Sequence, residues 1–202
     1  CALPIFGGAL IHLVIGTFYL WGAISLYVAS WLRSYDDSIS IDLVKSIFPF
    51  MMLTINVMPS FGIKLAEKIG FKVSLTINII IYSLAVFLCS FITNFWGFFV
   101  VYAFVGGVSN GLIYMVPVVL GLKYFPDKKG MVNGIIIAGY GFGSFIFNFI
   151  ALAVVNQDNV KPTIEDDEGK HEYFDEDVYG KVPRMLRILA LCYVIIGLIG
   201  TL

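Results

Sequence analysis

Polar side chains stand at helical spacing inside stretches of the sequence that are otherwise apolar. Tyr140, Ser144 and Asn148 follow one another at intervals of four residues. Tyr114 follows Asn110 at the same interval. Side chains four residues apart lie on one face of a helix. A polar group in hydrocarbon is costly unless it has a partner or water, so each of these faces is expected to meet a cavity or another helix.

Tyrosine hydroxyls and the imidazole of His12 are the groups in these stretches that could bind a solute. A tyrosine hydroxyl could donate into a cavity, or it could bind a neighbouring backbone carbonyl, and the sequence leaves both open. His12 is a titratable group inside a predicted helix, and it could take part in proton coupling or pack as a hydrogen-bonded residue. The glycine pairs at four-residue spacing predict close helix packing instead: Gly107 with Gly111, and Gly139 with Gly143.

Patterns typical of enzymes do not occur in a plausible context. There is no Ser/His/Asp arrangement, no His-rich metal motif and no Gly-Lys-Ser/Thr phosphate loop. Cys1, Cys89 and Cys192 match no spacing of a metal site or a disulfide framework. The sequence therefore predicts a protein that is not an enzyme, with no metal, no cofactor and no nucleic-acid partner.

Long uncharged runs must position these polar groups. The chain is 59% hydrophobic and 13% charged, with a mean hydropathy of +0.89, far from the mix of a soluble domain. A helix needs about 20 apolar residues to cross a bilayer, and continuous apolarity excludes a β-barrel. The runs predict an all-α membrane protein of six transmembrane helices, over residues 4–32, 44–63, 72–92, 95–122, 130–155 and 186 to the end.

Charge in the loops predicts the orientation of these helices. Lysines dominate the second loop, around Lys64 and Lys68, and the fourth loop, around Lys123 and Lys128. By the positive-inside rule these two loops face the cytoplasm or the equivalent compartment of an organelle. The identity of the membrane, plasma or organellar, stays open.

The fifth loop, residues 156–185, is predicted to be an acidic, non-cytoplasmic segment. Its Glu165–Glu168 core is typical of a solvated or disordered stretch, while Tyr173 and Phe174 suggest local docking. The domain organisation expected is helices one to five over 1–155, this loop, and the start of a sixth helix over 186–202. The last apolar run is about five residues short of a crossing, so the chain is expected to be a truncated piece of a longer protein.

The second loop carries a resemblance to a known family. Leu65-Ala-Glu-Lys-Ile-Gly-Phe-Lys72 resembles the Leu-Ala-Asp-Arg-x-Gly-Arg-Lys motif of the major facilitator superfamily, between its second and third helices. The resemblance implies a conformational-switch turn whose acid engages helix ends and bases in one state and releases them in another. Its residues here are Glu67, Lys68, Gly70 and Lys72, with Asp127, Lys128 and Lys129 in the fourth loop.

The fourth loop makes the resemblance more specific. Lys123-Tyr-Phe-Pro-Asp-Lys-Lys-Gly130, followed by the glycine-rich stretch Ala138–Ser144, is similar to the oxalate/formate antiporter and monocarboxylate-transporter branches of that superfamily. Gly16-Thr-Phe-Tyr-Leu-Trp21 is similar to the Gly-x-x-Tyr-x-Trp of the first helix in that branch. The resemblance spans helices one to five.

By this resemblance the chain is the N-terminal six-helix half of a twelve-helix, alternating-access carrier of small carboxylates such as oxalate, formate, lactate or pyruvate. Its partners would be the substrate, the lipid bilayer and the C-terminal half of the same parent protein. The substrate wall expected from the motif alignment consists of Tyr19, Tyr114 and Tyr140, with Trp21 a weaker candidate that could face the packing side.

Departures from the family bear on mechanism. The fourth helix lacks the embedded Arg of proton-coupled facilitators, and the fifth lacks the Pro of the antiporter motif. No Lys or Arg is expected deep in a helix, so no countercharge for an anion is expected in this half. Exchange or facilitated diffusion is easier to reconcile with these absences than proton symport. The alternative hypothesis is a non-transporting structural or receptor-like membrane subunit that keeps the fold.

Overall fold

Long apolar helices make up most of the protein, whose computed structural model describes residues 3–165 and 169–202. Within these residues five helices are long and apolar enough to cross a membrane, and a bent pair supplies a sixth span. The predicted all-α, multi-pass membrane fold is thereby confirmed. Cys1 and the acidic residues Asp166, Asp167 and Glu168 of the fifth loop lie outside the described residues.

The first span is a continuous helix with a 3-10 turn in its middle. It comprises α1 (Leu3–Ile15), the 3-10 turn η1 (Gly16–Leu20) and α2 (Trp21–Arg33). A 3-10 stretch inside a helix often marks a functional hinge. Here the tightened turn contains Tyr19.

The second span is bent by 50°. It runs from the short α3 (Ile41–Lys45) through α4 (Ile47–Val57) to α5 (Pro59–Ile69). Proline lacks an N–H and its ring clashes with the carbonyl four residues earlier, so Pro59 is the physical reason for the bend. The helix expected over 44–63 is instead a bent pair, and it extends to Ile69.

The fourth span is the most irregular. It consists of α7 (Phe95–Phe98), the π-helical η2 (Phe99–Gly106), α8 (Gly107–Tyr114) and α9 (Val116–Tyr124). Pro117 stands in the first turn of α9, which explains the break after Tyr114. A second predicted binding residue therefore lies at an irregular point of its span.

The remaining elements complete the bundle. The third and fifth spans are the unbroken α6 (Phe71–Cys89) and α10 (Lys129–Val155), the latter preceded by the turn η3 (Pro126–Lys128). The fifth loop holds β1 (Ile164–Glu165), its antiparallel partner β2 (Glu172–Tyr173) and α11 (Glu176–Tyr179), and the sixth span is α12 (Val182–Thr201).

The sixth helix differs from its prediction. It begins at Val182, four residues before the expected start, and its 20 residues are about enough to cross a bilayer. Arg184 therefore lies within the helix, where the sequence reading placed the end of a loop. Prolines fit the first turn of a helix well, and Pro183 occupies that turn here.

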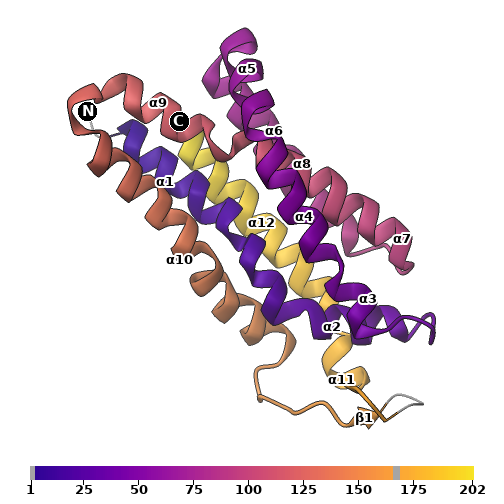
Figure 1. Cartoon of the computed structure of the whole chain (residues 1–202). Helices are drawn as coiled ribbons and strands as arrows, with labels where there is room; N and C mark the ends of the chain where they lie inside the picture. The colour runs from indigo at the N-terminus through magenta and orange to yellow at the C-terminus, as the bar shows by residue number, and fades with distance from the viewer. Residues whose placement is uncertain (1–2, 166–168) are drawn as a thin grey trace.

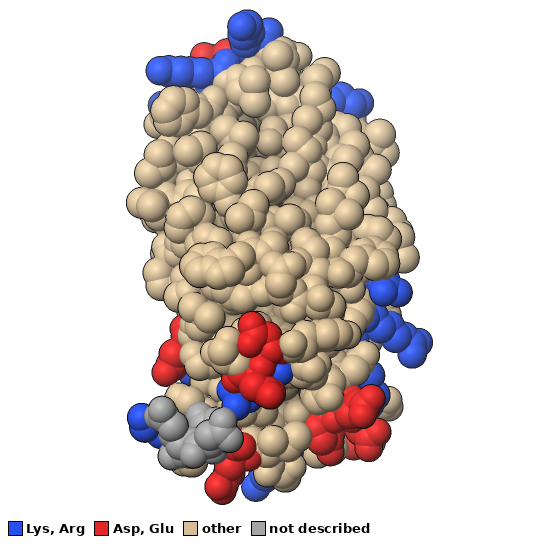
Figure 2. Space-filling model, turned by 90° about the vertical axis from the view of Figure 1, so that its right-hand side faces the viewer, with Lys and Arg blue, Asp and Glu red and all other residues tan. Residues whose placement is uncertain are grey.

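Packing places the first span at the centre of one group of helices. α1 lies against α10, α12 and α9, whereas α4 and α5 lie against α8, and α6 contacts both α8 and α12. Figure 1 shows the described ends of the chain at the same end of the bundle, with α11 and β1 at the other. A broad band of uncharged residues separates the charged ends in Figure 2, as expected for a protein that crosses a bilayer.

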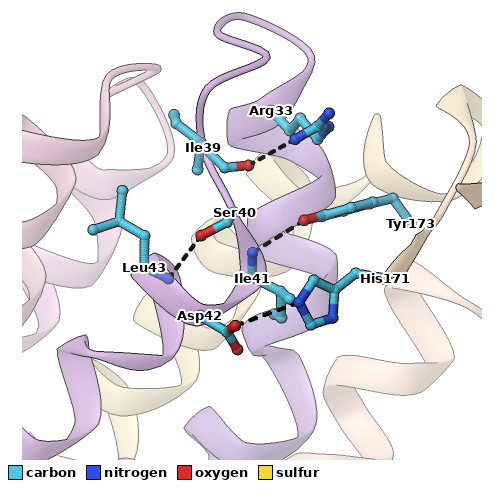
Figure 3. Close-up of polar contacts among 8 residues, drawn as sticks. All are labelled: Arg33, Ile39, Ser40, Ile41, Asp42, Leu43, His171 and Tyr173. Carbon is cyan, nitrogen blue, oxygen red and sulfur yellow. Dashed lines mark hydrogen bonds and ion pairs between the residues drawn. The ribbon is translucent and has the colours of Figure 1, made fainter. Parts of the chain in front are cut away.

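The C-terminal part of the fifth loop is docked on the bundle (Figure 3). The side chains of Tyr173 and Phe174 are buried, the backbone N–H of Ile41 donates to the Tyr173 hydroxyl at 3.1 Å, and the Phe174 ring stacks on Tyr27 at 4.4 Å. The guanidinium of Arg33 lies 4.9 Å from the centre of the Tyr173 ring. The described part of the loop is therefore held to α2 and α3, in agreement with the docking that its aromatic residues suggested.

Polar contacts also connect the loops at this end of the bundle. His171 Nε2 lies 3.3 Å from Asp42 Oδ2, so the residue that precedes β2 makes a polar contact with α3 as well. In the preceding turn, the hydroxyl and backbone N–H of Ser38 donate to Asp36 Oδ1 at 2.6 and 3.0 Å, which lowers the pKa of the Asp36 carboxyl. These contacts stabilise the end of the bundle opposite to the lysine-rich loops.

Replacing Phe174 by alanine is expected to release the fifth loop. The change removes a buried ring, a loss that costs about 3–5 kcal/mol where the surroundings cannot collapse. Limited proteolysis of the purified protein in detergent, followed by mass spectrometry of the fragments, should show cleavage in residues 156–181 accelerated about tenfold or more. Glu172→Ala, a substitution of an exposed neighbour, should change little. Rapid cleavage of the unaltered loop at low protease would contradict docking.

Candidate solute-binding site

Four aromatic rings from three spans meet near the middle of the bundle. Tyr140 of α10 lies edge-on to Tyr19 of η1 at 5.7 Å and to Tyr114 of α8 at 5.2 Å between ring centres. His12 of α1 lies 5.6 Å from the Tyr114 ring and 6.1 Å from the Tyr140 ring. We call these four residues the aromatic cluster. The structure thus brings together the three tyrosines predicted as a substrate wall and adds His12.

The tyrosine hydroxyls of the cluster are available to a ligand. Tyr19 is 48% exposed, Tyr114 is half-buried and Tyr140 is 8% exposed. Among residues 3–165 and 169–202, none of the three hydroxyls has a hydrogen-bond partner. Tyr82, by contrast, is buried in the core with its hydroxyl 3.0 Å from Thr17 Oγ1. The cluster therefore offers donors that the protein itself does not use.

His12 presents an acceptor to the same region. Its side chain is fully buried, and Nδ1 lies 3.1 Å from the carbonyl oxygen of Gly8. A carbonyl oxygen only accepts, so the neutral ring carries its proton on Nδ1 and leaves Nε2 as an acceptor. Nε2 has no partner among the described residues. A buried polar atom without a partner is rare in proteins, and here it belongs to a ring that packs against Tyr114 and Tyr140.

Local features of the sequence explain how the cluster is positioned. The side-chain Nδ2 of Asn110 donates to the carbonyl of Ile15 at 2.9 Å, which gives a partner to a backbone group at the passage from α1 to η1. Gly16 lies directly against the backbone of Tyr140, because any Cβ there would overlap the carbonyl of Tyr140. The absence of a side chain at Gly16 thereby allows η1 and α10 to approach closely enough for Tyr19 and Tyr140 to touch.

Trp21 takes a different position from the tyrosines. It is 1% exposed, and its ring packs at a tilt against the core residues Tyr102 at 4.8 Å and Phe98 at 6.1 Å. It nevertheless borders, with Tyr19, a cavity of about 510 Å³ between η1, α2 and the start of the second span. Most of the Trp21 ring therefore faces the packing side, which was the alternative that the sequence left open.

Lys45 is a residue that the sequence reading missed. It ends α3, its side chain is exposed, and it lines the same cavity as Tyr19. A cationic side chain at the opening of an aromatic wall suits an anionic solute. A lysine next to a run of apolar residues gives no sign of this in the sequence, because only the fold shows that α3 packs on α2 and brings Lys45 to the cavity that Tyr19 lines.

The predicted switch residues occupy the opposite end of the bundle. Glu67 Oε1 lies 3.9 Å from Lys123 Nζ, and the Lys123 ammonium lies 4.4 Å from the centre of the Phe71 ring. Gly70 joins α5 to α6 with a φ of +96°, a conformation that favours glycine. Both charged groups are more than half exposed, so the pair contributes at most about 1 kcal/mol and can open readily.

The other predicted switch residues lie close by along the chain. Lys68 is in the last turn of α5 and Lys72 in the first turn of α6. Asp127 and Lys128 belong to η3, and Lys129 begins α10; all three are exposed. Among the described residues, the ion pair that links the second and fourth loops is that of Glu67 with Lys123, a lysine outside the predicted set.

The four predicted packing glycines stand where helices approach closely. Gly107 and Gly111 of α8 lie against Thr54 and Met58 of the second span. Gly139 and Gly143 of α10 lie against the carbonyls of Ala9 and Leu13 in α1. Gly62, which spacing did not single out, lies against the backbone of Leu112.

Comparison with known proteins finds transporters. No family model matches the chain. It is 27% identical to apicoplast pyruvate carrier 1 of Toxoplasma gondii over an alignment of 241 residues that covers 96% of this chain and 43% of the carrier. It is 26% identical to the uncharacterized MFS-type transporter YhjX of Escherichia coli (strain K12) over 148 residues, covering 73% of this chain and 36% of that protein.

A third relative is monocarboxylate transporter 14 of Mus musculus, 24% identical over 119 residues that cover 59% of this chain and 21% of the transporter. The chain spans less than half the length of each of these relatives.

Proposed function

We propose that this chain, a relative of monocarboxylate-related transporters of the major facilitator superfamily, forms the N-terminal six-helix half of a secondary carrier of small carboxylates. The aromatic cluster is the observation that carries the proposal. Three tyrosines with unpaired hydroxyls and a histidine with an unpaired ring nitrogen pack ring against ring across three spans. A membrane protein keeps such groups unsatisfied where a polar solute can satisfy them.

The chemistry of the cluster suits a short carboxylate. Tyrosine hydroxyls donate to carboxylate oxygens, while the rings form a dry and narrow wall that excludes larger solutes. Lys45 lies at the opening of the cavity next to Tyr19 and would attract an anion toward it. Pyruvate, lactate and formate fit this description, and pyruvate is the solute named for one of the relatives. Oxalate is a dicarboxylate alternative that requires more countercharge.

Alternating access would proceed by rocking of this bundle against a second six-helix bundle of the same parent protein, around a site near the membrane midplane. The contact between Glu67 and Lys123 would form in one state and open in the other, since a weak exposed pair costs little to break. Among the described residues of the spans no Asp or Glu lies beside the cluster, which favours exchange or facilitated diffusion over proton symport.

The proposal is tested by transport in proteoliposomes that contain the intact protein in which this chain occurs. We expect saturable uptake of labelled pyruvate, accelerated when unlabelled pyruvate, lactate or formate is present inside, as for an exchanger. Liposomes without protein provide the baseline, and a neutral solute of similar size, such as glycerol, controls for leakage. Absence of movement of any of these anions by folded protein would refute the carrier and favour a non-transporting membrane subunit.

A further inference from the structure

A groove between α6 and α12 lies on the outer surface of the bundle, away from the aromatic cluster. Its volume is about 640 Å³. Ile80 and Leu84 of α6 form one wall, and Leu191 and Val194 of α12 form the other. The first three of these side chains are 43%, 49% and 58% exposed, so the groove is open at the surface of this bundle, and its apolar walls suit the hydrocarbon of a membrane.

Two arginines stand at one end of this groove. Arg184 and Arg187 both line it, and both have exposed side chains in the first turns of α12. Of the residues that the structure describes, no acidic one lines the groove. An apolar trough that ends in two cations has the charge pattern of a phospholipid, whose acyl chain is apolar and whose phosphate is anionic.

Arg187 is held in place by other groups of the protein. Its Nε donates to Ser90 Oγ at 3.1 Å, and its guanidinium lies 4.7 Å from the centre of the Phe91 ring. These two contacts orient the planar guanidinium and leave its terminal N–H groups without a partner among the described residues. Because a guanidinium binds phosphate oxygens through two parallel hydrogen bonds, this fixed orientation suits a phosphate.

The depth of the two arginines in the membrane also fits a phospholipid. At 1.5 Å per residue, Arg184 and Arg187 lie about 3 to 8 Å from the start of α12, where lipid headgroups meet the acyl chains. From Phe87 to Ile80 the groove follows α6 inward for about 10 Å. A headgroup at the arginines would therefore place the first part of its acyl chain along the apolar walls.

We propose that the groove between α6 and α12 is a binding site for an anionic phospholipid, with the phosphate on Arg184 and Arg187 and one acyl chain against Leu84 and Leu191. The lipid belongs to the leaflet on the side of the fifth loop. Arginines at helix ends also extend to headgroups in general, without selecting among lipids. Selection of anionic over zwitterionic lipid, and dependence on the shape of the groove, separate the site from that general behaviour.

The test measures lipids bound to the intact detergent-purified protein by native mass spectrometry. Phosphatidylglycerol and phosphatidylcholine with identical acyl chains are offered as an equimolar mixture. We expect the wild type to retain phosphatidylglycerol preferentially, and Arg184→Gln and Arg187→Gln each to weaken that preference about fivefold, as for the loss of one basic contact. Lys181→Gln is the matched control, because Lys181 precedes α12 at the same membrane face but does not line the groove.

A second variant tests the part of the groove that is proposed to bind the acyl chain. Leu84→Trp keeps both arginines and fills the groove from a side chain that is half exposed, so folding should tolerate it. We expect it to reduce bound phosphatidylglycerol, while thermal unfolding without added lipid stays as in the wild type. Equal binding of the two lipids, equal effects of the Arg184, Arg187 and Lys181 variants, or undiminished binding by Leu84→Trp would each overturn the proposal. The readout is independent of transport, so it is not affected if the proposed function fails.

Discussion

Gly16→Ala is expected to lower the thermal stability of the protein more than any other single methyl addition in the first span. A Cβ at this position would overlap the carbonyl oxygen of Tyr140, and the neighbouring atoms it meets are backbone atoms of α10. Backbone cannot turn aside as a flexible side chain can, so the helices must separate. Overpacking commonly costs about 1–3 kcal/mol, and the rigid neighbour places this case at the upper end.

The measurement is thermal unfolding of the purified protein in detergent, followed by tryptophan fluorescence. A cost of about 3 kcal/mol corresponds to a fall in Tm of roughly 10 °C for a chain of this size. Gly22→Ala is the matched control, because it makes the same chemical change in the same span where no atom lies within 4 Å of the added Cβ. Similar Tm values for the two variants would contradict the close approach of η1 and α10.

Gly16 also illustrates what the sequence could and could not predict about packing. Spacing of four residues singled out Gly107, Gly111, Gly139 and Gly143, because two small residues on one helix face form a recognisable pattern. Gly16 belongs to no such pair. Its counterpart is the backbone of another helix, and such a contact exists only once the helices are assembled.

The spans were predictable in number and approximate extent because a bilayer requires long apolar runs. The breaks inside the spans were harder to predict. Pro59 and Pro117 are visible in the sequence, but prolines in membrane helices can be accommodated without a bend, so the 50° angle after Val57 required the structure. The start of α12 was placed too late, because Arg184 was read as a loop residue although its long side chain can reach the interface from within a helix.

The candidate site was predictable in its residue types but not in its arrangement. Tyr19, Tyr114 and Tyr140 came from the resemblance to a family, and the structure shows that their rings touch. His12 was recognised as polar and buried, but its position between Tyr114 and Tyr140 depends on the crossing of α1, α8 and α10. Lys45 could be assigned to the site only from the position of α3 in the fold, because no local sequence pattern predicts that position.

Tyr140 is expected to be the residue of the aromatic cluster whose loss impairs transport most. It is the central ring, in contact with Tyr19, Tyr114 and His12, so its removal opens the wall on three sides at once. Tyr140→Phe keeps the ring and removes one donor. A hydrogen bond to a charged group is worth about 1.5–3 kcal/mol, which predicts a loss of roughly tenfold to hundredfold in kcat/KM for carboxylate exchange.

Tyr140→Ala should abolish saturable exchange, because the aromatic cluster then lacks both the donor and the ring that the other three residues contact. Counterflow of labelled pyruvate in proteoliposomes measures both variants, and thermal unfolding shows whether each is folded. Tyr35→Phe is the control, since Tyr35 is 61% exposed at the end of the bundle and removal of its hydroxyl should leave transport unchanged. If Tyr140→Phe exchanged pyruvate as fast as the wild type while Tyr140→Ala remained folded and merely slower, the hydroxyl would not contact the solute and the ring alone would shape the cavity.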